Sequence, residues 1–153
     1  MKPETSGERG LPKYPVESAQ VTEKGLISDF NRWREEMRPD DYMDQAILLM
    51  PLEMIRELNR QGWPIQPGDL GENVTTSGID YADFKIGHRY QLGPEVLIQI
   101  SKACLPCRIL HVLPYIGVQI GPEFVKVLKD RRGWYARVLK GGRIRRGDVI
   151  RLL

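Results

Sequence analysis

The two cysteines of the chain are the residues best suited to covalent or metal chemistry, and they form a Cys-x-x-Cys motif at Cys104 and Cys107. The motif directly follows an apolar run at 96–100. Such a pair can act as a redox dithiol, as half of a zinc site, or as one functional thiol beside a packed neighbour. A redox dithiol is expected at the start of a helix in a βαβ frame, which the surrounding pattern does not predict. The spacing alone leaves three interpretations.

A zinc site would require every cysteine and histidine of the chain. A closed structural zinc takes four ligands, and the sequence offers only Cys104, Cys107, His88 and His111. His111 follows Cys107 by four residues, whereas His88 flanks a different predicted strand. We therefore treat a zinc-stabilised fold as an alternative and do not expect zinc. Cys104 also fits the role of a small buried apolar residue.

A second candidate site is the loop from Pro67 to Ile79, which is rich in glycine and in polar side chains. Its glycines would let the backbone approach a ligand closely. Four of its side chains could converge on a polar ligand, namely Asp69, Glu72, Asn73 and Thr75. The alternative is a turn whose own backbone groups are capped by Asp69 and Asn73. The composition of the loop does not decide between the two.

Short strands must position these candidates. Apolar or alternating runs predict strands at 16–22, 46–50, 90–92, 96–100, 134–139 and 149–153. Two helices are predicted, one from Pro51 to about Gln61 and one from Pro122 to about Arg132. The charged segment 30–44 predicts an exposed loop or short helix. This pattern favours a mainly β fold with a few helices (α+β), built as a curled sheet or β-barrel.

The length of 153 residues suits a single domain. Residues 1–12 are polar and contain several Gly and Pro, so we expect a loose lead-in followed by one domain at 13–153. Charge is uneven, because residues 121–153 hold ten Lys or Arg against three Asp or Glu. A non-catalytic module that binds an anion through this basic third is the main alternative function. Without interleaved aromatic residues we do not expect nucleic acid as its partner.

The sequence also bears on the compartment. No apolar run approaches the ~20 residues that span a bilayer, and the first residues do not resemble a signal peptide. Two cysteines without an export signal are expected to be thiols in a reducing environment. We therefore expect a cytoplasmic protein without a membrane partner.

The glycine loop and the cysteine motif together resemble a known family. The sequence Gly-Asp-Leu-Gly-Glu-Asn-Val-Thr-Thr-Ser-Gly-Ile at 68–79, followed by Ile86-Gly87, Gly93 and Leu105-Pro106-Cys107, closely resembles the MOSC family, named for the C-terminal domain of molybdenum-cofactor sulfurases. Similar segments at 13–16 and 137–148 extend the resemblance over nearly the whole chain. Three positions depart from the pattern: Ser28 replaces a glycine of Gly-Leu-x-Gly-Asp, Leu105 replaces a basic residue, and Cys104 is additional.

The resemblance implies a β-rich, barrel-like fold and one functional cysteine. Members of the family include sulfur-carrier domains and reductases of N-hydroxylated compounds. Cys107 matches the cysteine that carries a sulfane sulfur or ligates molybdenum in a pterin cofactor, and Glu72 and Asn73 match the core of the ligand loop. Partners would be a sulfur donor or acceptor, or an electron-donor protein. Whether the chain is itself an enzyme stays open.

Cofactor contacts are expected from the loop and from nearby basic residues. The candidate set is Lys13, Asp69, Glu72, Asn73, Thr75 and Arg137. Lys13 and Arg137 lie in segments similar to the family, whereas Arg108 is chosen for its adjacency to Cys107. These cations could provide a positive field for a thiolate, and the arginines could also bind the phosphate of a pterin.

Overall fold

The computed structural model describes residues 1–2, 10–29 and 42–153. Most of the charged segment predicted at 30–44 and part of the predicted lead-in at 1–12 therefore lie outside the described residues. The boundary between lead-in and domain stays a prediction.

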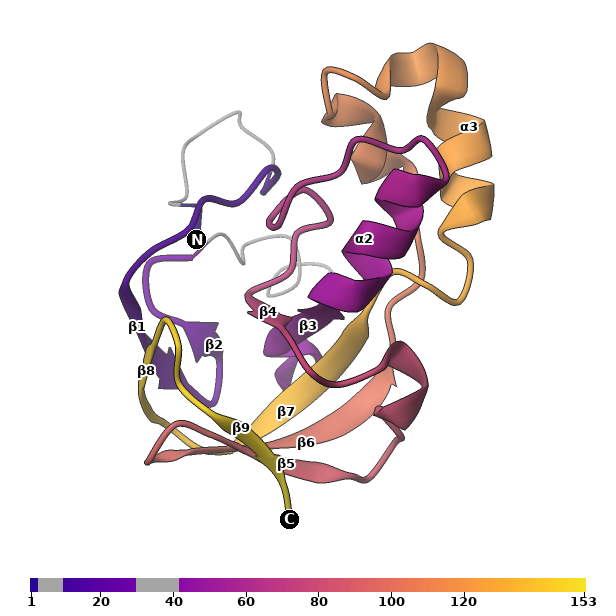
Figure 1. The fold of residues 1–153 in the computed structure, drawn as a ribbon. Helices are drawn as coiled ribbons and strands as arrows, with labels where there is room; N and C mark the ends of the chain where they lie inside the picture. Colours follow the sequence, from indigo (N-terminus) through magenta and orange to yellow (C-terminus); the bar gives the residue numbers. More distant parts are fainter. Residues whose placement is uncertain (3–9, 30–41) are drawn as a thin grey trace.

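Two β-sheets and two α-helices form the described part of the chain (Figure 1). The larger sheet has six strands in the order β4-β3-β7-β6-β5-β9, and the smaller has three in the order β2-β1-β8. The strands are β1 (Ser18–Thr22), β2 (Gly25–Leu26), β3 (Ile47–Pro51), β4 (Val74–Thr76), β5 (Arg89–Leu92), β6 (Val96–Ala103), β7 (Trp134–Lys140), β8 (Gly142–Arg145) and β9 (Ile150–Leu152). The helices are α2 (Leu52–Arg60) and α3 (Gly117–Val127), with short 3-10 turns η1 (Met43–Gln45), η2 (Tyr81–Asp83) and η3 (Arg108–Val112).

The apolar side chains form two cores, which meet at β3 of the larger sheet. One core joins the two sheets and includes Val21, Ile47, Ile98 and Ala136. The other packs α2, η3 and α3 together and includes Met50, Leu58, Leu110 and Phe124. β3 contributes to both cores, and all of its residues are buried. Its run is therefore continuously apolar, as expected for a strand covered on both faces.

The larger sheet curls because its pairing is irregular and partly mixed. β6 and β7 pair antiparallel with register shifts near Ile98 and Lys102, and such bulges bend a sheet. β4 adds in parallel to β3, with Leu49 opposite Val74. In Figure 1 both helices lie above this sheet and the smaller sheet lies to one side. The prediction of a mainly β, curled α+β fold is confirmed.

The bounds of the second helix differ from the prediction, and some short strands were not predicted. The second helix runs from Gly117 to Val127, not from Pro122 to Arg132, so Pro122 lies inside it. Helix formation begins earlier because the Gly117 N–H bonds to the carbonyl of Leu113, which directly follows η3. The helix ends at Val127 with Leu128 as its C-cap, and the positive φ of 60° at Asp130 is incompatible with its continuation to Arg132. The strands β4 and β8 were not predicted, because each is short and defined mainly by its partner strand.

Candidate functional site

Cys107 is placed by the pairing of β6 with β7. Ala103 at the end of β6 lies opposite Trp134 at the start of β7. The hydrogen bonding between the two segments extends one residue further, since the Cys104 N–H donates to the Gly133 carbonyl at 2.9 Å. The chain then leaves the sheet as an irregular segment that ends at η3. Cys104 is buried, with 1% of its surface exposed, whereas Cys107 is exposed. The two cysteines of the motif thus differ sharply in access.

The side chain that contacts Cys107 belongs to Arg132. Its Nη1 donates to the Leu105 carbonyl at 2.8 Å and to the Cys107 sulfur at 3.3 Å. Arg132 is only 6% exposed. Burial lowers its pKa, but nearby groups, foremost the sulfur atoms of Cys104 and Cys107, raise the pKa above its usual value. A permanently charged guanidinium is therefore held against the exposed sulfur.

Tyr81 fixes the turn that presents Arg132. Its hydroxyl donates to the Gly133 carbonyl at 3.2 Å and lies at the same distance from the Gly133 N–H. The Trp134 indole donates to the Tyr81 carbonyl at 3.2 Å. Burial raises the pKa of Tyr81 to about 12, so its hydroxyl is neutral at physiological pH. These contacts hold the start of β7 in register with the end of β6.

A second polar group joins three segments of the chain around Asp29. The Asp29 carboxylate forms a buried ion pair with Lys13. It also accepts from the Asn73 amide at 2.6 Å and from the Lys2 backbone N–H at 2.8 Å. The Asn73 side-chain oxygen accepts from the Leu48 N–H at 2.9 Å. Asn73 is therefore a bridge between β3 and Asp29, which is a structural role.

Glu72 is buried in the glycine loop. Its Oε1 accepts from the Gly68 N–H at 2.6 Å and from the Thr75 hydroxyl at 3.1 Å. Its Oε2 is buried and has no hydrogen-bond partner within the part of the chain that the structure describes. Burial raises the pKa of Glu72. Gly68 has a φ of +98° and packs against the Lys13 carbonyl, where a side chain would collide.

Asp69 connects the glycine loop to the segment that follows Cys107. Its carboxylate accepts from the Gln66 N–H at 2.8 Å and from the hydroxyl of Tyr115. Burial, together with the hydrogen bond to Asp69, raises the pKa of Tyr115. The loop and the segment after Cys107 are thus joined by a direct side-chain contact, although they are separated by 46 residues.

The predicted site residues fall into separate places. Lys13 and Asn73 meet at Asp29, and Glu72 meets Thr75. Arg137 does not join them: it pairs with Asp44 at 2.8 Å, and its neighbours Ala136 and Val138 point into the core, so its side chain lies on the opposite face of β7.

Two residues that matter here were missed as site residues. Asp29 lay in the Gly25–Asp29 segment noted for its family resemblance, which was a usable signal. Arg132 carried no signal, because its partner Cys107 is distant in sequence and only the fold brings the two together.

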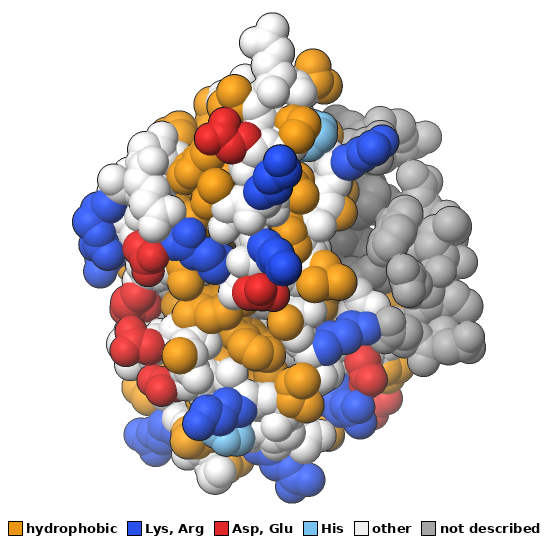
Figure 2. Space-filling view, turned by 90° about the vertical axis from the view of Figure 1, so that its right-hand side faces the viewer, with side chains coloured by type: hydrophobic (Ala, Val, Ile, Leu, Met, Phe, Trp, Pro, Cys, Tyr) orange, Lys and Arg blue, Asp and Glu red, His pale blue; other side chains and the backbone are white. Residues whose placement is uncertain are grey.

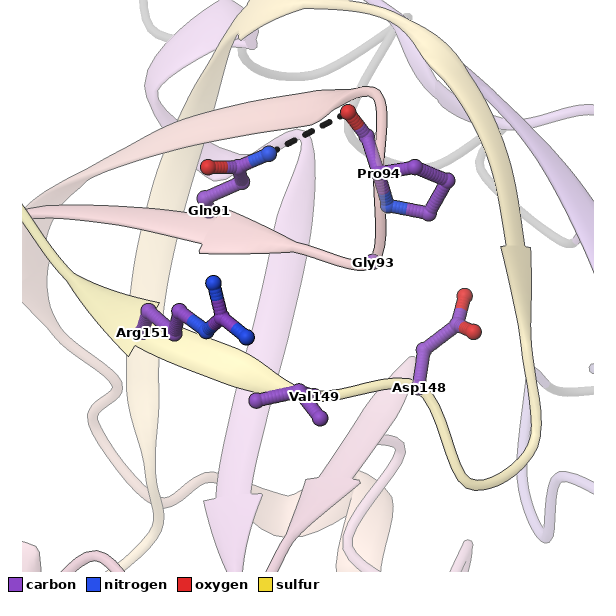
Figure 3. Close-up of a pocket in the computed structure, with 6 residues that line it drawn as sticks. All are labelled: Gln91, Gly93, Pro94, Asp148, Val149 and Arg151. Carbon is purple, nitrogen blue, oxygen red and sulfur yellow. Dashed lines mark hydrogen bonds between the residues drawn. The ribbon is translucent and has the colours of Figure 1, made fainter.

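The remaining polar features do not form a metal cluster. Among the described residues, no group of three or more His, Cys, Asp or Glu is placed to hold a metal ion. His111 instead packs against Gly121 of α3. Two surface hollows of about 280 and 310 Å³ flank β9. The first is lined by Gln91, Gly93, Pro94, Asp148, Val149 and Arg151 (Figure 3); the predicted site residues line neither hollow.

The surface near Cys107 is partly apolar. Leu105 is 71% exposed, and Val118 and Ile120 of α3 are exposed too. Figure 2 shows the side of the molecule on which α3 lies in Figure 1, where apolar side chains are interspersed with Lys, Arg, Asp and Glu.

The sequence and the fold resemble those of known proteins. The model of the MOSC domain matches residues 23–151. A protein named reductase from Gibberella moniliformis is 36% identical over 88 residues, a match that covers 56% of this chain and 15% of that protein. YiiM from Geobacillus stearothermophilus is 29% identical, with a TM-score of 0.71 and coverage of 99% and 70% of the two chains. YiiM from Escherichia coli is 22% identical, with a TM-score of 0.67 and coverage of 92% and 65%.

The chain spans only about 15% of the length of the reductase, so the match concerns one part of that protein. The residues that the structure describes include no helix that is both long and apolar enough to cross a membrane.

Proposed function

The chain belongs to the MOSC domain family, and we propose that Cys107 is its functional thiol and carries a sulfane sulfur for transfer to an acceptor. The observation that supports this proposal is the contact between an exposed sulfur and a buried guanidinium, 3.3 Å from Arg132 Nη1. A cation beside a cysteine favours the thiolate, which is the nucleophile. Exposure lets a donor reach the sulfur atom.

Transfer of the sulfane sulfur takes place by two thiolate exchanges at Cys107. The Cys107 thiolate attacks the outer sulfur of a donor persulfide, and the donor leaves as its own thiolate. Cys107 then holds the sulfur as a persulfide anion, beside the positive charge of Arg132. Attack by an acceptor nucleophile on the outer sulfur returns Cys107 to the thiolate. We place this exchange in the cytoplasm, with a sulfur donor or acceptor protein as the partner.

The second candidate is ligation of molybdenum in a pterin cofactor by Cys107, for reduction of N-hydroxylated compounds. Similarity to a protein named reductase favours it. The donor chemistry fits, because thiolate is a soft metal ligand and the buried Glu72 Oε2 has no partner among the described residues. Glu72 would then accept a hydrogen bond from the pterin, while Lys13, Asp69, Asn73 and Thr75 hold the loop in shape. The bound cofactor would supply two-electron redox chemistry, with electrons from a donor protein.

Protein made in a host that synthesises the cofactor tests both candidates. Molybdenum, pterin and cyanide-releasable sulfur are measured per chain, for the wild type and for Cys107→Ala and Cys104→Ala. Sulfur lost only in Cys107→Ala supports the carrier, and molybdenum lost only in that variant supports the reductase. If the wild type binds neither, even after reconstitution with cofactor or with a persulfide donor, both candidates are wrong.

Alkylation separates these candidates from a non-catalytic anion-binding module. A functional Cys107 reacts quickly in the native state, because it is exposed and lies beside Arg132. A thiol that stays inert until denaturation would favour the binding module, with the basic residues at 121–153 as its surface. Binding of an anionic polymer that weakens steeply with salt would add nucleic acid as its partner.

A further inference from the structure

The second cysteine of the motif lies next to the same guanidinium. The Cys104 sulfur is 3.8 Å from the Leu105 carbonyl oxygen, which accepts from Arg132 Nη1 at 2.8 Å. The same nitrogen is 3.3 Å from the Cys107 sulfur. Three consecutive contacts therefore join the two sulfur atoms through one carbonyl and one cation.

We propose that Cys104 is a resolving cysteine, which attacks a persulfide on Cys107 and releases the sulfane sulfur as hydrogen sulfide. The inference rests on the sulfane-sulfur form of the proposed function. It gives the chain a second activity besides transfer, namely reductive release of sulfur. It also assigns a role to the cysteine by which the sequence departs from the family pattern.

The step balances without an outside oxidant. The Cys104 thiolate attacks the inner sulfur of the Cys107 persulfide, and a disulfide forms between Cys104 and Cys107. The bond between the inner and outer sulfur breaks, and the outer sulfur leaves with both electrons of that bond. It takes up the proton of the Cys104 thiol and the proton of the persulfide, and leaves as hydrogen sulfide. The sulfane sulfur is reduced and the two thiols are oxidised. A dithiol reductant then restores both thiols.

Burial fixes the order of the two steps. Cys104 is 1% exposed, so an external donor reaches Cys107 and not Cys104. Arg132 contacts the Leu105 carbonyl and the Cys107 sulfur, so its positive charge lies beside the persulfide on Cys107.

The segment between the cysteines can close. It forms neither helix nor strand, and Pro106 suits a turn. A disulfide requires the Cα atoms of the two cysteines to lie about 4.4–6.8 Å apart. A turn at Leu105 and Pro106 brings the two sulfur atoms together for resolution.

Anaerobic treatment with inorganic polysulfide tests the proposal. The full chain is treated, desalted and analysed by intact mass, by thiol counting and by sulfide release, next to Cys104→Ser, Cys104→Ala and Cys107→Ser. We expect wild type to lose two thiols, to become two hydrogen atoms lighter, and to release about one sulfide per chain. Both Cys104 variants should keep one extra sulfur atom on Cys107 and release none. Cys107→Ser should stay unchanged.

The outcomes separate the two proposals. If wild type keeps the extra sulfur atom as stably as the Cys104 variants do, the persulfide forms but is not resolved, and Cys104 is only a packed residue. If none of the proteins gains sulfur or forms the disulfide, the sulfane-sulfur function itself is wrong. Two Cys104 variants are used because one substitution at a buried position can unfold the chain, and each is first checked for wild-type thermal unfolding.

Discussion

Replacement of Asn73 by alanine should destabilise the protein strongly, because the Asn73 amide makes two buried contacts at once. Its oxygen accepts from the Leu48 N–H on β3 at 2.9 Å, and its nitrogen donates to the Asp29 carboxylate at 2.6 Å. Leu48 is 3% exposed and Asp29 is 7% exposed. Water therefore has little access to replace either contact in the variant.

The size of the effect follows from these two contacts. A buried N–H left without a partner costs about 1–3 kcal/mol, and a hydrogen bond to a charged group contributes about 1.5–3 kcal/mol. Asp29 keeps its ion pair with Lys13, so its carboxylate loses one hydrogen bond but still has a partner. Together the losses reduce the free energy of unfolding by roughly 2.5–6 kcal/mol. At about 2–4 °C per kcal/mol for a chain of this size, Tm falls by roughly 5–24 °C.

Urea unfolding, with the midpoint and the slope fitted separately, measures this loss. The matched control is Asn59→Ala, which removes amide contacts to the carbonyls of Trp63 and Ile65 at 2.7 and 3.0 Å. Asn59 is exposed, so water replaces those contacts and the loss should be about 1 kcal/mol. If Asn73→Ala costs no more than this control, the Asn73 amide does not bridge β3 and Asp29, and the structural role is refuted.

Three further predictions concern the loop and the cysteine. Burial raises the pKa of Glu72 above 4.5, so the folded state loses stability as pH rises from about 4.5 through that raised pKa. Glu72→Gln should remove this pH-dependent loss. If the difference between the urea midpoints of the variant and of wild type is the same at low and at neutral pH, this prediction is wrong. Gly68→Ala should cost roughly 3 kcal/mol or more in urea unfolding, because a side chain would meet the Lys13 carbonyl. Gly78→Ala, also at positive φ but in open space, should cost only about 1–2 kcal/mol; equal losses would refute the collision. Arg132→Met should slow alkylation of Cys107 at least about fivefold, the factor for ~1 kcal/mol, which is the attraction of two charges ~4 Å apart in water. Arg131→Met should leave the rate unchanged, and equal rates for wild type and Arg132→Met would show that Arg132 does not activate Cys107.

Most of the architecture could be predicted from local pattern. Apolar and polar residues alternate along β7, with Ala136 and Val138 buried, which indicates that one face of this strand is covered. The continuous apolar run of β3 indicates that both of its faces are covered. The α3 boundary could not be predicted, because Pro122 is favourable at a first helical position and only the contact from Gly117 to Leu113 starts the helix earlier. Short strands such as β4 depend on a partner strand and leave little pattern of their own.

Some features of the candidate site could be predicted from the sequence, and others depend on the tertiary structure. The sequence by itself determined the family, the mainly β fold and the two segments that could do chemistry, since these depend on residue type and local spacing. Only the tertiary structure decided that Asn73 and Lys13 meet at Asp29, that Arg137 lies on another face, and that Arg132 contacts Cys107. Each of these contacts joins residues at least 16 positions apart. Their distance and burial follow from the packing of whole strands, which no local pattern encodes.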